Sequence, residues 1–165
     1  MQKSALVQKQ KDDDELSSQI KGETMQASMM NSQLMISSIL THAEKNFPTT
    51  EMVSVTVDNP CHRQNYKTFA ARCRQLANVL DSLGANFGDR IGTLAWNDYR
   101  HMELYYGVSC SGMVCHTINP KLFPEQVAYV INHAQDRFLF VDVLVMPLLE
   151  ALKDHLTGVE AIVVL

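Results

Sequence analysis

The stretch Met113–Asp142, MVCHTINPKLFPEQVAYVINHAQDRFLFVD, decides the fold class. It begins with an apolar run typical of a strand and passes through a short loop, HTINPK, at 116–121. Pro124 follows where a helix is expected to begin, because the first helical turn tolerates proline. A second apolar run, RFLFV, occupies 137–141. Strand, helix and strand in this order predict a parallel βαβ unit. The loop either only starts the helix or belongs to a site.

The same rhythm extends to both sides of this stretch. Four strands are predicted at 90–96, 113–118, 137–141 and 160–165, and three helices at 98–111, 124–134 and 147–156. Strands that alternate with helices favour a mostly parallel sheet with flanking helices on both faces. We therefore predict an α/β fold with right-handed crossovers. The order of the strands does not follow from the pattern.

The segment before these strands has a different pattern. Apolar residues at helical spacing predict a helix that begins near Leu34 and ends at Pro48. EMVSVTV, at 51–57, alternates like a strand, and CHRQ, at 61–64, is a candidate partner strand. Asn65 is then the expected N-cap of a long amphipathic helix. Gly84 stands where the glycine after a helix end is usual.

Residues 1–33 differ from everything that follows. They are rich in Gln, Lys, Asp and Ser and contain no aromatic residue. Such a segment buries too little apolar surface to offset its chain entropy, so we predict a disordered polar tail. Several methionines within it mean that translation can start internally. The structured α/β portion is then expected to span 34–165.

Composition excludes several classes of protein. The 165 residues suit one ordinary domain, and a net charge of −4 argues against a nucleic-acid binder. The four cysteines form no C-x-x-C pair or other zinc spacing, and two of them fall in apolar-periodic segments, so reduced core thiols are the simpler interpretation. The longest apolar stretch, FLFVDVLVMPLL, is too short to span a bilayer, and no secretory signal is visible. We expect a cytoplasmic protein without a transmembrane segment.

Common catalytic motifs are absent from the sequence. There is no dinucleotide fingerprint, phosphate-binding loop or paired-histidine metal motif. GVSCSG has the wrong spacing for a nucleophile elbow and lies in a predicted helix, which argues against Ser109 as a nucleophile. His101 is more simply a surface or hydrogen-bonded histidine than a base, and His116 a core residue whose polar atoms are paired.

Position in the sheet is the remaining signal. In open parallel sheets, ligands bind beyond the carboxyl ends of the strands. Those ends are predicted at Trp96-Asn97-Asp98, Asn119-Pro120-Lys121 and Asp142. The alternative for each is local: Asn97 or Asp98 caps a helix, the prolines punctuate the chain, and Lys121 is solvated.

Two stretches carry a resemblance to a known family. AWNDYRHMELYYGVS (95–109) and HTINPKLFPEQVAYVINHAQD (116–136) resemble the N-terminal region of bacterial medium- and long-chain fatty-acyl-CoA synthetases, within the AMP-forming, adenylate-forming enzymes. The resemblance spans about residues 30–165, and Lys121 stands where arginine is usual. It implies the N-terminal part of the adenylate-forming large domain, incomplete at the C-terminus.

The resemblance implies an activity for the complete enzyme. A fatty acid reacts with ATP to give an acyl-adenylate and pyrophosphate, and the acyl group then passes to coenzyme A, with Mg²⁺ as the implied metal. The family's Ser/Thr/Gly-rich loop, its aromatic-Gly-x-Thr-Glu stretch, its ribose-binding Asp and its catalytic Lys have no counterpart here. We therefore assign no catalytic, cofactor-binding or metal-binding residue, and expect this chain to be inactive alone.

An alternative is a stand-alone, non-catalytic α/β module that associates through its last strand. AIVVL, at 161–165, is nearly all apolar, and such an edge invites pairing with another strand. Members of the family often dimerise through N-terminal segments, which makes self-association an expectation as well. A small nucleotide-binding domain is disfavoured by the missing phosphate loop. Acyl chain length does not follow from these residues.

Overall fold

The computed structural model describes residues 32–56 and 59–165. The chain divides into two units, Met1–Gln33 and Leu34–Leu165, and the second contains all the helices and strands named below. The predicted polar tail lies almost wholly outside the described residues, so its disorder stays a prediction. Within the described ranges, no helix combines the length and apolar character that crossing a membrane requires.

The second unit begins with a helix and a hairpin. Helix α2 (Ile36–Asn46) ends just before Pro48, as the sequence predicts. Strands β1 (Glu51–Ser54) and β2 (His62–Asn65) pair antiparallel, with Met52 opposite Gln64. The strand predicted at 51–57 is therefore shorter, because Thr56 already turns the chain by pairing with Asn59.

Helix α3 (Tyr66–Ser82) has both of its predicted end signals. The Asn65 side chain accepts a hydrogen bond from the Thr68 backbone N–H at 2.9 Å, which makes Asn65 the N-cap. After the helix, Gly84 has a φ of +78°, a conformation that side chains rarely adopt. Phe69, Ala70 and Cys73 form a core with Leu40 of α2, so the apolar stripe of α3 packs as predicted.

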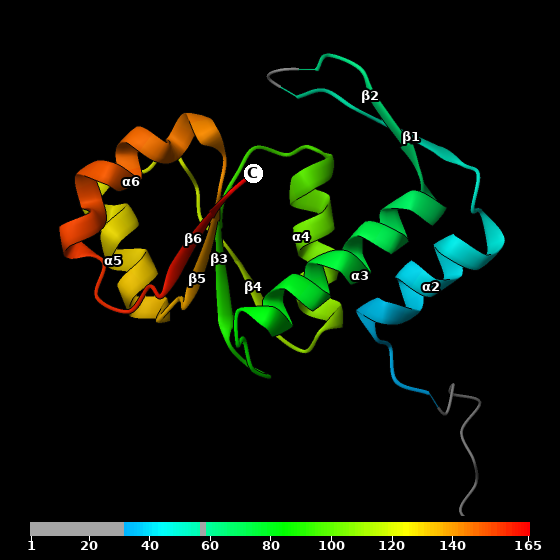
Figure 1. Cartoon of the computed structure of the whole chain (residues 1–165), viewed down its shortest axis with the longest axis horizontal. Coiled ribbons are helices and arrows are strands. Elements are labelled where there is room, and N and C mark those ends of the chain that lie inside the picture. The colour runs from blue at the N-terminus through cyan, green and yellow to red at the C-terminus, as the bar shows by residue number, and fades with distance from the viewer. Residues whose placement is uncertain (1–31, 57–58) are drawn as a thin grey trace, which may run out of the picture. The chain divides into compact units, whose positions relative to one another are not determined.

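Four parallel strands form the main sheet (Figure 1). They are β3 (Arg90–Leu94), β4 (Val114–Thr117), β5 (Phe138–Val141) and β6 (Ala161–Val164), in the order β4-β3-β5-β6. Helix α4 (Tyr99–Cys110) joins β3 to β4, and α5 (Pro124–Ala134) joins β4 to β5. Between β5 and β6 lie a 3-10 turn (Val143–Val145), α6 (Met146–Leu152) and a second 3-10 turn (Lys153–His155).

The helices cover the two faces of the sheet in pairs. Helices α3 and α4 pack on one face and α5 and α6 on the other (Figure 1). The first core contains Leu80, Ile91, Leu104, Val108, Phe138 and Phe140, and the second is built around Leu94, Val127, Ile131, Leu139 and Leu149. Across the sheet, the connection from β3 to β4 and the connection from β4 to β5 run in opposite directions, and their helices lie on opposite faces. Both crossovers therefore have the same hand. The predicted α/β class is confirmed.

Candidate functional site

A pocket of about 480 Å³ lies where β3 and β4 end. Ligands of parallel sheets bind at this edge, so it is the candidate that the sequence predicted. The pocket brings together two of the three predicted groups, since its lining comprises Ala95, Trp96, Asn97, His101, Tyr105 and residues 117–121. The Trp96 side chain is 40% exposed, and its indole gives the pocket an open aromatic wall.

The loop after β4 is held by its own hydrogen bonds. The Asn119 side chain accepts from the Lys121 backbone N–H at 2.9 Å, which fixes the turn, and Lys121 itself is exposed. The Gln126 side chain accepts from the Phe123 backbone N–H at 3.2 Å and closes the start of α5. The predicted exposure of Lys121 and the predicted helix start at Pro124 are confirmed. Because the loop also lines the pocket, a role in ligand binding stays a prediction.

The third predicted group, Asp142, lies at a different point of the same edge. The chain leaves β3 and β5 towards opposite faces, so the sheet's topological switch point is between these two strands. There Arg100 donates to Asp98 at 2.5 and 3.0 Å and to Asp142 at 3.2 Å. The carboxylates are buried, with side chains only 4% and 2% exposed. Ionic groups therefore fill the switch point.

Each carboxylate in this cluster also caps a turn of the chain. Asp98 accepts from the Arg100 backbone N–H at 2.8 Å at the start of α4, and Asp142 accepts from the Leu144 N–H at 3.0 Å. The predicted helix cap at Asp98 is confirmed. Sequence reasoning missed Arg100, because its partner Asp142 lies 42 residues away and no local spacing signals the contact. The cluster holds the start of α4 and the turn after β5.

His101 stands in the wall of the pocket. It is 5% exposed, stacks on Tyr105 with ring centroids 4.8 Å apart, and its Nε2 lies 2.9 Å from Thr93 Oγ1. Burial lowers the pKa of His101 below its usual 6.5, against the smaller opposing effect of Asp98. Of the two predicted interpretations, a surface or a hydrogen-bonded histidine, the structure supports the second.

The lowered pKa of His101 predicts a pH dependence. The unfolded chain protonates near pH 6.5, whereas the folded chain resists protonation. The contribution of His101 to the free energy of unfolding is therefore complete above pH 6.5. It is lost as the pH falls towards the pKa of His101 in the folded chain. When the pH falls from 7.5 to 5.5, we expect the melting temperature of His101→Gln to drop less than that of the wild type. The same change at the exposed His133 is the control and should leave the difference unchanged.

His116 forms a second polar pair on the α5 face of the sheet. Its Nδ1 lies 2.8 Å from an oxygen of Asp136, whose side chain is fully buried. Burial raises the pKa of Asp136, although His116 opposes that shift. The pair reaches across β3 at Gly92, where any Cβ would lie 2.9 Å from Asp136 Oδ2. The predicted pairing of His116 is confirmed, but its side chain is 26% exposed, so the predicted core position is not.

The remaining sequence candidates form no reactive group. Ser109 lies on α4, as expected, and not at a strand-to-helix turn. All four cysteines are free, and burial raises the pKa of Cys73 to about 12 and that of Cys115 to about 11. Throughout 32–56 and 59–165, no three His, Cys, Asp or Glu side chains gather closely enough to hold a metal ion.

Comparison with known proteins places this geometry in a family. The family model "AMP-binding enzyme" matches residues 40–165. The chain is 50% identical over 141 residues to 3-methylmercaptopropionyl-CoA ligase of Ruegeria lacuscaerulensis, which covers 86% of this chain. Over 141 residues it is 43% identical to medium-chain-fatty-acid–CoA ligase of Ectopseudomonas oleovorans, again with 86% of this chain covered.

Solved structures share the fold. The anthranilate CoA ligase AuaEII, crystallised with anthranoyl-AMP, superposes with a TM-score of 0.73 at 24% identity, over 79% of this chain and 25% of that one. The chain spans 26% of the length of each of the two ligases that it matches in sequence. It belongs to the AMP-binding enzyme family, and its described part corresponds to an N-terminal portion of the adenylate-forming acyl-CoA synthetases.

Proposed function

We propose that residues 34–165 supply the N-terminal α/β portion of the large domain of an AMP-forming acyl-CoA ligase. The complete enzyme joins a fatty acid to coenzyme A and converts ATP to AMP and pyrophosphate. The observation that carries this proposal is the family match over residues 40–165, together with a pocket at the carboxyl edge of the matching sheet. The two ligases named above support a carboxylic acid as the substrate.

In this proposal, ATP, Mg²⁺ and coenzyme A are ligands of the complete enzyme. The pocket between β3 and β4 contributes an aromatic wall from Trp96 and a cation from Lys121 at its rim. A lysine there attracts anionic groups as a point charge, without the planar fork of the arginine that is usual in the family. The chain then forms the sheet and the rim of the pocket against which the ligands bind. We place the enzyme in the cytoplasm.

The purified chain alone is expected to lack ligase activity, because the phosphate-binding and catalytic motifs of the family are absent from its sequence. The assay supplies ATP, Mg²⁺, a medium-chain fatty acid and coenzyme A, and follows the release of AMP and pyrophosphate. A heat-denatured sample of the same preparation sets the background. Turnover above that background would contradict the assignment of the catalytic groups to other parts of the enzyme.

A non-catalytic association module is the second candidate, and strand β6 favours it. In the order of the described strands β6 is the last, and its Ile162 and Val164 side chains are 39% and 49% exposed. An apolar edge strand is a template for pairing with a second copy. Sedimentation at micromolar concentration separates the two: a stable dimer that Val164→Lys breaks supports the module, whereas disordered aggregation or a monomer counts against it.

A further inference from the structure

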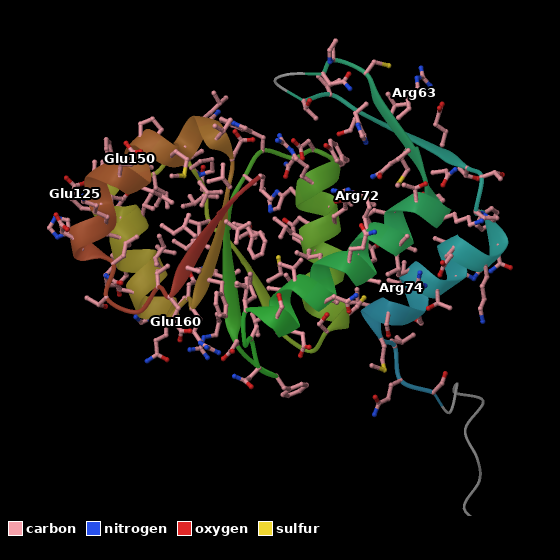
Figure 2. All side chains as sticks on the ribbon, viewed as in Figure 1. Arg63, Arg72, Arg74, Glu125, Glu150 and Glu160 are labelled. Atoms are coloured by element: carbon pink, nitrogen blue, oxygen red, sulfur yellow. The ribbon has the colours of Figure 1, made fainter. Side chains whose placement is uncertain are left out.

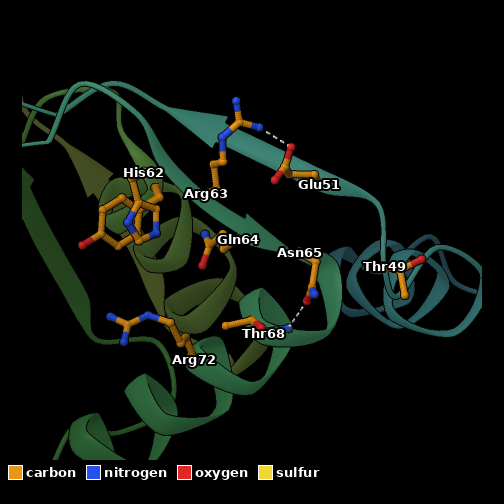
Figure 3. A pocket seen from close by; sticks show the side chains of 9 residues that line it. Thr49, Glu51, His62, Arg63, Gln64, Asn65, Thr68 and Arg72 are labelled. Atoms are coloured by element: carbon orange, nitrogen blue, oxygen red, sulfur yellow. Dashed lines mark hydrogen bonds and ion pairs between the residues drawn. The ribbon is translucent and has the colours of Figure 1, made fainter.

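A second pocket, of about 490 Å³, lies between the hairpin and the start of α3 (Figure 3). Its lining includes Glu51, His62, Gln64, Thr68, Arg72 and Tyr99. Two of these lining residues, Gln64 and Tyr99, also line a neighbouring pocket that includes Asn97 and His101. Figure 3 shows the Gln64 side chain lying between the ring of His62 and the Asn65–Thr68 turn that begins α3.

Unpaired buried polar atoms gather at this pocket. Of the four buried side-chain nitrogen and oxygen atoms that lack a partner among the described residues, three belong to it: His62 Nε2, Gln64 Nε2 and Gln64 Oε1. Gln64 is only 9% exposed. Folded proteins almost always pair such atoms. An amide with an unpaired donor and an unpaired acceptor therefore points to a ligand that offers both.

The surroundings of Gln64 are rigid, and the lining holds two guanidinium groups, Arg63 and Arg72, and one carboxylate, Glu51. His62 stacks on Tyr99 with centroids 3.6 Å apart and an interplanar angle of 10°, which holds the ring in place. The Nε of Arg72 donates to Glu103 Oε1 at 2.6 Å, so the guanidinium is anchored from behind while it lines the pocket. Glu51 is paired with Arg63. The acidic group in the lining thus has its own partner.

Helix α3 contributes the positive end of its dipole to the pocket, but its Lys67 and Thr68 N–H groups are not available to a ligand. The N–H groups of Lys67 and Thr68 already donate to Pro48 O and Asn65 Oδ1. The 17-residue helix α3 still directs the positive end of its dipole at the pocket. The donors for a ligand are then side chains: the Gln64 amide, the Thr68 hydroxyl and the Arg72 guanidinium.

We propose that this pocket binds a small organic anion that bears a hydroxyl group beside a phosphate or carboxylate. The oxyanion accepts hydrogen bonds from Gln64 Nε2, Thr68 Oγ1 and Arg72, and the hydroxyl donates to Gln64 Oε1. Binding of this kind involves no group at the strand ends. It is therefore independent of the ligase activity proposed above.

The test titrates the full 165-residue chain with glycerol 3-phosphate, glycerate and inorganic phosphate at constant ionic strength. Calorimetry measures affinity, and NMR follows the Gln64 side-chain amide. We expect saturable one-site binding of glycerol 3-phosphate or of glycerate, and the tighter of the two identifies the oxyanion. Equal affinity for inorganic phosphate and glycerol 3-phosphate would overturn the role of the hydroxyl, and no saturable binding of any probe would overturn the site.

Two variants make the test specific. Gln64→Leu should weaken binding by roughly tenfold or more and raise the melting temperature of the free chain, because an unpaired buried amide is removed. Thr68→Val keeps the side-chain shape and should also weaken binding, which covers the case in which the first variant does not fold. Gln75→Leu, on the exposed side of α3, is the matched control. Wild-type affinity in either pocket variant would overturn the proposal.

Discussion

Replacing Arg100 by methionine is expected to lower the free energy of unfolding by about 3–5 kcal/mol. The change leaves Asp98 and Asp142, with side chains only 4% and 2% exposed, as two buried carboxylates without their cation. A buried charge that loses its partner keeps its desolvation cost and gains nothing in return. Urea denaturation followed by circular dichroism measures the loss. It is a large share of the 5–15 kcal/mol that holds an ordinary domain together.

Arg63→Met is the matched control for this change. Arg63, on the hairpin (Figure 2), forms an ion pair with Glu51, and both side chains are more than half exposed. Exposed pairs contribute about 0–1 kcal/mol, so this variant should unfold almost like the wild type. Combining Arg100→Met with Asp142→Asn should recover part of the loss, because one unpaired charge is removed. Equal stability of the two arginine variants would show that the buried cluster does not support the fold.

Gly92→Ala is expected to cost about 1–3 kcal/mol, the usual penalty for overpacking a dense core. The new Cβ would lie 2.5 Å from Leu139 Cδ2 and 2.9 Å from Asp136 Oδ2. Leu139 and Asp136 are buried, so neither can move without disturbing the core or the His116 pair. The thermal midpoint of the variant measures the effect, and the contact to His116 should weaken with it.

Gly158→Ala is the control for the glycine. A Cβ at Gly158 meets nothing within 4 Å, and the residue is exposed. We expect its midpoint to stay at the wild-type value. If Gly92→Ala melted at the same temperature as Gly158→Ala, the close approach between β3 and the His116–Asp136 pair would be refuted.

Local signals in the sequence predicted most of the fold. Helix α5 begins at Pro124 and ends at Ala134, as its pattern indicates, because proline at the start and periodic apolar residues are short-range features. The Asn65 cap and the glycine after α3 were found for the same reason. Strand ends were less accurate: β3 ends at Leu94, although the apolar run continues to Trp96. A run of apolar residues does not show at which residue the hydrogen bonding between two strands ends.

Long-range geometry could not be predicted. The order β4-β3-β5-β6 depends on which strands pair, and every connecting segment is compatible with several orders. The Arg100 cluster joins residues that are 42 positions apart in the sequence, so no motif spacing marks it. The predicted site was found only because strand ends share one edge of a parallel sheet. That rule located Trp96, Asn119 and Lys121 together but not their partners.

A chimera with a related ligase tests whether this chain builds the N-terminal portion of an acyl-CoA ligase. The segment of Ruegeria lacuscaerulensis 3-methylmercaptopropionyl-CoA ligase that is 50% identical to this chain over 141 residues is replaced by the residues found here. If those residues build the N-terminal portion of an acyl-CoA ligase, the chimera should fold with the melting behaviour of the parent. It should also form acyl-CoA well above the background of this chain alone. A chimera that folds as the parent does but forms no acyl-CoA would contradict the account.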